Sequence, residues 1–94
     1  MKKIKAEVKH EGHKFYKVID GLESMLEYEL YGPSTVVFVH TFVPEELRGK
    51  GLAKELIKEG LDWAISNKME IIPACSAVRR FIEFNEEYRT YFQK

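Results

Sequence analysis

Two sets of residues in the chain are of types that can do chemistry, and the first is the segment Arg48-Gly49-Lys50-Gly51. It lies between a strongly apolar run and a long amphipathic segment. Glycines let backbone N–H groups approach a ligand, and the unpaired donors and dipole of a helix N-terminus favour an anion. This spacing predicts a phosphate-binding loop at the start of a helix. An ordinary glycine-containing turn is the alternative, because Gly-x-Gly alone is common.

The second set is His40, near the end of one apolar run, and Cys75, directly after another. If both runs are parallel neighbouring strands, both residues lie near their carboxyl ends, where α/β sheets bind ligands. Cys75 would also begin a helix, which lowers a thiol pKa and favours a nucleophile. The alternatives are an inert buried cysteine and a buried histidine that shares a strand face with Phe38 and Phe42.

The first third of the chain predicts an antiparallel meander. Alternation of apolar and charged residues indicates strands near residues 4–9, 15–19 and 22–31, with a tight turn at 10–13 whose histidines lie at the surface. Residues 35–43 are apolar on both faces, with Val36, Phe38 and Phe42 together on one of them. This pattern is typical of a strand in the middle of a sheet, covered on each side.

The second half predicts strands and helices in alternation. Apolar residues at helical spacing indicate a long amphipathic helix over 53–65, a short parallel strand over 70–74 and a second helix over 76–84. The aromatic ending, which includes Tyr88, is expected to pack back on the domain. The fold class is therefore α/β (α+β): a meander followed by β-α-β-α around a central mixed sheet, in one domain over 1–94.

Composition limits the classes of partner and compartment. Among 94 residues, 15 Lys and Arg balance 15 Asp and Glu, which argues against nucleic acid and anionic membranes as partners. A single cysteine excludes an intrachain disulfide and a cysteine-rich metal site, so no metal is expected. No apolar segment is long enough to span a membrane or serve as a signal peptide, and a cytoplasmic protein is expected.

The loop and its surroundings resemble a known family. Residues 48–53, Arg-Gly-Lys-Gly-Leu-Ala, are similar to the Arg/Gln-x-x-Gly-x-Gly/Ala signature of the GCN5-related N-acetyltransferases, and the preceding Val43-Pro44 and following helix also match. The resemblance implies a minimal form of that fold and acetyl-coenzyme A as cosubstrate. It further implies that the loop holds the pyrophosphate and that main-chain groups of two strand residues bind the pantetheine arm. These cofactor-binding candidates are Phe42, Val43, Arg48, Gly49, Lys50, Gly51, Leu52 and Ala53.

A strand containing His40-Thr41, paired with a strand that ends in Pro73-Ala74-Cys75-Ser76, is similar to a short bacterial branch of this family. The resemblance implies acetyl transfer to an amine, with Cys75 and His40 as candidate catalytic residues. Either His40 or a water deprotonates the amine for direct transfer, or Cys75 takes the acetyl group first. Tyr88 does not lie in the family's second motif and cannot be assigned as the general acid.

The acceptor, a small amine or a peptide, cannot be identified from the sequence. The family usually places helices after its first strand, where this chain has only the turn at 10–13. We expect an open acceptor side, or a partner protein that supplies the missing wall. A non-catalytic module that binds or senses acyl-coenzyme A is the alternative function, and a plain interaction domain is a third.

Overall fold

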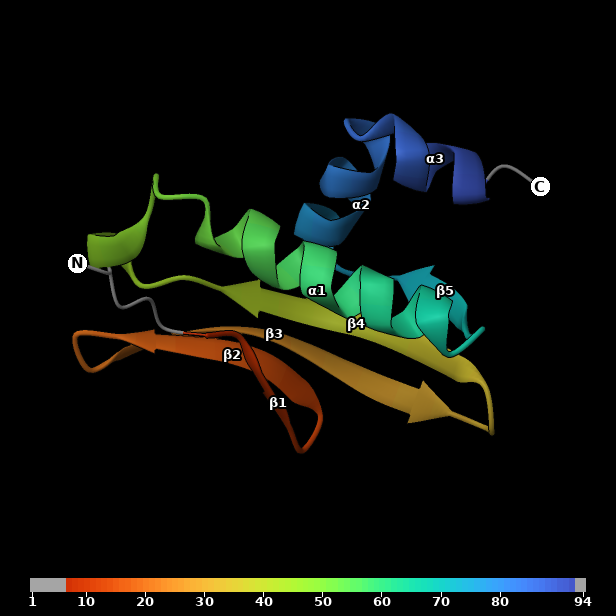
Figure 1. The fold of residues 1–94 in the computed structure, drawn as a ribbon, viewed down its shortest axis with the longest axis horizontal. Helices are drawn as coiled ribbons and strands as arrows, with labels where there is room; N and C mark the ends of the chain where they lie inside the picture. The colour runs from red at the N-terminus through yellow and green to blue at the C-terminus, as the bar shows by residue number, and fades with distance from the viewer. Residues whose placement is uncertain (1–6, 93–94) are drawn as a thin grey trace, which may run out of the picture.

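The computed structural model describes residues 7–92 and shows a single five-stranded sheet with helices packed on it (Figure 1). Strand order follows the chain, with three antiparallel pairings and a parallel pairing of the last two strands. The predicted meander followed by β-α-β-α in a mixed sheet is confirmed. The elements are β1 (Lys9–Glu11), β2 (Lys14–Ile19), β3 (Leu22–Tyr31), β4 (Thr35–Phe42), a 3-10 turn η1 (Glu45–Leu47), α1 (Leu52–Ser66), β5 (Glu70–Pro73), α2 (Ser76–Glu83) and α3 (Glu86–Phe92).

The N-terminal strand differs from the prediction. Residues 4–6 of the expected strand over 4–9 lie outside the described residues, residues 7–8 are not in a strand, and β1 covers Lys9–Glu11 instead. His10 therefore belongs to a strand, not to the turn. Its ring stacks on Phe15 at a centroid distance of 4.0 Å, and its Nε2 lies 2.5 Å from the Tyr28 hydroxyl. Burial lowers the pKa of His10.

The core lies between one face of the sheet and the helices, and α1 crosses that face (Figure 1). Gly60 lets α1 approach the sheet closely, because a Cβ there would lie 2.8 Å from Leu26 and 3.1 Å from Phe38. The apolar positions of 53–65 thus form the buried side of a helix, as their spacing predicts. No helix among residues 7–92 is long and apolar enough to cross a membrane.

A β-bulge changes the face on which the last residues of β4 lie. Tyr28 pairs with Phe38 and Glu27 pairs with His40, so Val39 is an extra residue without a partner on β3. Beyond it, Thr41 pairs with the fully buried Leu26 and shares the inner face. Phe42 pairs with Met25, the outward neighbour of Leu26. The prediction that Phe42 shares the face of Val36 and Phe38 is wrong, because the extra residue inverts the alternation.

The outer face of the sheet has no helical cover among the described residues. Large apolar side chains on that side stay exposed, including Phe42 and Ile72, each 42% exposed, and Tyr31, 58% exposed. Val37 is buried, but the expectation that β4 is covered on each side is wrong for its outer face, where Phe42 is exposed. The two faces of β4 therefore have different surroundings, one apolar and packed and the other open to solvent.

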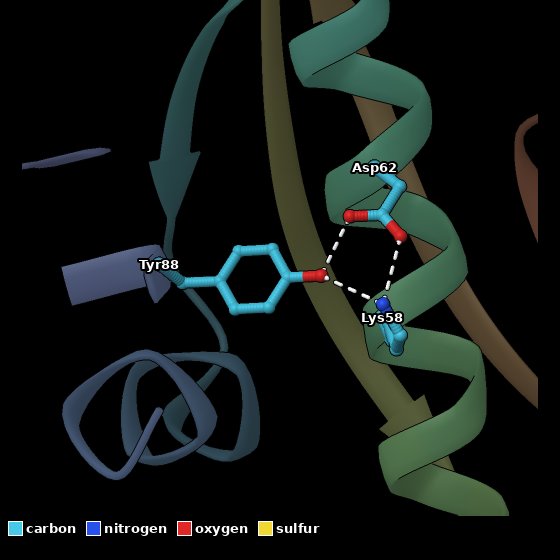
Figure 2. Close-up of polar contacts among 3 residues, drawn as sticks. All are labelled: Lys58, Asp62 and Tyr88. Carbon is cyan, nitrogen blue, oxygen red and sulfur yellow. Dashed lines mark hydrogen bonds and ion pairs between the residues drawn. The ribbon is translucent and has the colours of Figure 1, made fainter. Parts of the chain in front are cut away.

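A polar cluster anchors α3 to α1, as Figure 2 shows. The hydroxyl of Tyr88 donates to Asp62 Oδ1 at 2.6 Å, and Lys58 Nζ contacts both Asp62 and the Tyr88 oxygen. Tyr88 is only 4% exposed and packs against Phe81. Burial and the hydrogen bond to Asp62 raise the pKa of Tyr88. The chain does pack back through Tyr88, as predicted from its aromatic ending.

We expect Tyr88→Phe to lower the free energy of unfolding by about 1 kcal/mol, because it removes one hydrogen bond to a partly exposed carboxylate. Tyr31→Phe is the matched control, since its hydroxyl bonds Glu29 on a largely exposed side chain and its loss should cost under about 0.5 kcal/mol. Urea denaturation measures both. Equal losses in the two variants would contradict the anchoring role of Tyr88.

Candidate functional site

The loop that the sequence predicts to bind phosphate has two glycines in the left-handed region, directly before a helix. Gly49 and Gly51 have φ of 83° and 81°, in the left-handed region that favours glycine, and Gly51 is the N-cap of α1. No side chain caps this helix. Within the described part of the chain, the amides of Gly49, Lys50 and Gly51 have no hydrogen-bond acceptor. Together with the unpaired amides of the first helical turn, they form a set of donors at the positive end of a helix dipole.

Side chains around the loop divide into those that support it and those that remain exposed. Arg48 Nε donates to the carbonyl of Val43 at 2.9 Å, so this part of its guanidinium braces the loop. Leu52 is buried and fixes the start of α1 in the core. Lys50 is exposed. Arg48 and Leu52 therefore hold the loop in place, while its amides remain without an acceptor among the described residues.

A cleft of about 370 Å³ begins beside this loop, between the first turns of α1 and α2. Its lining is mainly apolar but contains two cations, Lys54 and Arg80. Arg79 does not line it, because its guanidinium donates to the carbonyls of Pro73 and Ala74. The full lining is Ala53, Lys54, Ile57, Ala77, Arg80, Phe81, Phe84 and Asn85. Such a cleft suits a ligand with an apolar arm and an anionic end.

The strands β4 and β5 part beside the cleft. They pair only from Thr35 with Glu70 to Phe38 with Pro73. Beyond that point the amide of Cys75 still donates to the carbonyl of Phe38, and no further ladder pairing follows on this edge. The backbone of β4 over 39–42 therefore presents polar groups on the β5 side that the sheet does not use.

Cys75 lies at this opening as the N-cap of α2. Its Sγ is 3.3 Å from the hydroxyl of Thr41, which the bulge turns to the inner face. Burial alone raises the pKa of Cys75, but hydrogen bonds from Thr41 and from the amides of Val78 and Ala77 outweigh it, and the resulting pKa is below the usual value. The half-buried thiol is therefore set to form a thiolate.

His40 lies on the other face. It pairs with Glu27 and is exposed, whereas its neighbour Thr41 points inward to Cys75. The structure thus brings His40 and Cys75 to the same end of the two parallel strands, but it places their side chains on opposite sides of β4. Phe42 has its side chain on the outer face with His40, and only its main chain lies on the open edge of β4.

Sequence reasoning missed Thr41, although it lies in the quoted strand between His40 and Phe42. No glycine or proline marks the bulge at Val39, so nothing in the local sequence indicates that Thr41 turns to Cys75. The guanidinium of Arg79 donates to the carbonyls of Pro73 and Ala74, which precede α2. Among residues 7–92, no group of His, Cys, Asp and Glu is arranged to hold a metal ion.

Several known proteins are similar to this chain in sequence. Curated relatives, each called Protein NATD1, are 32% identical over 62 residues in Xenopus tropicalis and 34% identical over 62 residues in Bos taurus. Each match covers 66% of this chain, and it covers 57% of the Xenopus protein and 55% of the bovine protein. The chain thus matches little more than half the length of these relatives.

The structural and family comparisons reach further along the chain. A solution structure of a GCN5-like protein from Staphylococcus aureus superposes with a TM-score of 0.71 and 30% identity, covering 88% of this chain and 83% of that one. The sequence profile described as GCN5-related N-acetyl-transferase matches residues 14–91. That range contains the glycine loop, the open edge of β4 and Cys75. This chain is a member of the GCN5-related N-acetyltransferase family.

Proposed function

We propose that this protein binds acetyl-coenzyme A and transfers its acetyl group to an amine. The unpaired amides of Gly49, Lys50 and Gly51 at the start of α1 carry the proposal, because they fit a pyrophosphate and nothing else among the described residues uses them. Arg48 holds the loop in place through Val43. Leu52 and Ala53 contribute the first helical amides, which the helix itself leaves unpaired.

The rest of the coenzyme fits the adjoining surfaces. The unused polar groups of β4, around the main chain of Phe42 and Val43, suit the amide groups of a pantetheine arm, which would pair with them as an added strand. Lys54 and Arg80 line the cleft and add positive charge near the phosphates. These assignments place the thioester near the opening between β4 and β5, where Cys75 and Thr41 lie.

Two routes of transfer use this opening. In the covalent route, the Cys75 thiolate attacks the thioester carbonyl, a bond from its sulfur to the acetyl carbon forms, and the bond to the coenzyme sulfur breaks. An amine then attacks acetyl-Cys75, forms the amide and releases the Cys75 sulfur. In direct transfer, the amine attacks the thioester itself and the coenzyme leaves as its thiol. In both routes His40, on the outer face, is placed to take the proton of an amine that arrives from that side.

We expect acetyl-coenzyme A to raise the melting temperature of the protein and Gly51→Glu to abolish that shift, because the new carboxylate repels the pyrophosphate. Gly32→Glu is the matched control: Gly32 also has a left-handed φ, 70°, and open space around it, but it lies in the β3–β4 turn. Both variants should lose about 1 kcal/mol of stability from backbone strain. Thermal denaturation with and without ligand measures this. A ligand shift retained by Gly51→Glu would refute the phosphate-binding role of the loop.

The lowered pKa of Cys75 predicts that its alkylation by iodoacetamide rises with pH at a midpoint below that of an ordinary thiol. Thr41→Val removes a hydrogen bond to the thiolate, so the midpoint should move upward and the rate at neutral pH should fall several-fold. Thr35→Val, on the same strand but beside Glu70, should leave the profile unchanged. An unchanged profile in Thr41→Val would show that Thr41 does not stabilise the thiolate.

The two routes differ in what mass spectrometry detects after incubation with acetyl-coenzyme A. We expect one added acetyl group on Cys75, absent from Cys75→Ala. Turnover that survives in Cys75→Ala would instead support direct transfer. Thiol release during a screen of amines and peptides tests transfer itself: coenzyme binding without thiol release for any acceptor would favour the binding or sensing module.

A further inference from the structure

The outer face of β3, β4 and β5 is both apolar and negatively charged. Its outward positions include Met25, Phe42 and Ile72, and the last two are large exposed apolar side chains. Between them stand the carboxylates of Glu27 and Glu29 on β3. No lysine or arginine occupies an outward position on these three strands, by the pairing register.

Other carboxylates on the sheet and on α1 form ion pairs with lysines. Glu23 is held by Lys14 at 2.6 Å, and Glu55 by Lys17 at 2.8 Å. The ion pairs found among residues 7–92 do not include Glu27 or Glu29. Glu29 accepts only the hydroxyl of Tyr31. Lys14 lies opposite Glu27 on β2, but its Nζ pairs with Glu23 instead. Glu27 and Glu29 are therefore not used by an ion pair within residues 7–92.

The position of Glu27 connects this charged face to the site. Glu27 pairs directly with His40 at the bulge, and His40 lies in the part of β4 over 39–42 that β5 leaves unpaired. Glu29 lies two residues further along β3, about 7 Å away and on the same face. The helices and the cleft proposed for the coenzyme lie on the inner side of the sheet, so an acceptor reaches the opening between β4 and β5 from the outer side.

We propose that this outer face, around Glu27, Glu29 and His40, binds the acceptor, and that it selects aliphatic amines that carry a second positive charge. The inference rests on the proposed transferase function and adds the class of substrate. One nitrogen lies near His40 and loses a proton before it attacks the acetyl carbon. The second, still charged, lies against the carboxylates of Glu27 and Glu29. The exposed apolar side chains contact the methylene chain between the two nitrogens.

Three small amines of equal chain length test this directly: butane-1,4-diamine, butylamine and 4-aminobutyrate. We expect kcat/KM for the diamine to exceed that for butylamine by about fivefold, because two exposed carboxylates each contribute modestly. The aminobutyrate, whose second group is negative, should be the poorest acceptor. The advantage of the diamine should shrink as salt is raised.

Variants then test whether Glu27 and Glu29 cause the preference for the diamine. The ratio of diamine to butylamine should fall toward one in Glu27→Gln and in Glu29→Gln. Glu23→Gln is the matched control, because Glu23 lies on the same strand and face but is paired with Lys14, and its ratio should remain that of the wild type. A ratio near one in the wild type, or an equal change in all three variants, overturns the selection by this face.

Failure of the proposed transferase function gives a different result. In that case no amine releases thiol from acetyl-coenzyme A, and the ratio of kcat/KM between diamine and butylamine cannot be measured. Amide chemical shifts of the coenzyme-saturated protein then decide the binding proposal by themselves. Perturbation at residues 25–29 and 39–42 by the diamine, and not by 4-aminobutyrate, supports it, and equal or absent perturbation overturns it.

Discussion

The parting of β4 from β5 is the constraint on which the site depends. In β4, the extra residue Val39 disrupts the ladder and bends the strand. In β5, Pro73 ends the pairing with Phe38 and has no N–H to donate further. The carbonyl of Phe38 accepts from Cys75 just past this point. An opening therefore forms where two strands would otherwise close, and backbone groups of β4 stay available to a ligand.

The same bulge separates two chemical environments. Before it, the inner face of β4 is represented by Val36 and Phe38, both fully buried. After it, Thr41 turns inward to the sulfur of Cys75, while His40 turns outward beside Glu27. A thiolate-stabilising hydroxyl and a candidate base thus lie on opposite sides of one strand. This arrangement suits a reaction in which two substrates approach from different faces.

Helix positions are fixed by contacts remote from the opening. Gly60 lets α1 lie close against Leu26 and Phe38, which sets the height of the glycine loop over the sheet. The Tyr88, Asp62 and Lys58 cluster holds α3 against α1 (Figure 2) and closes the end of the core. With its hydroxyl bound to Asp62 and its pKa raised, Tyr88 acts as an anchor.

The sequence by itself determined most of the strands and helices and the glycine loop before α1, because both depend on local rules. Helical spacing over 53–65 predicts the buried side of α1. Gly49 and Gly51 occupy the two positions of the loop that have a left-handed φ, which glycine adopts most easily. Tertiary structure alone decided that Thr41, and not His40, contacts Cys75. Which face a strand residue occupies depends on its pairing with a neighbouring strand, and a bulge set by β3 inverts the order without any local signal.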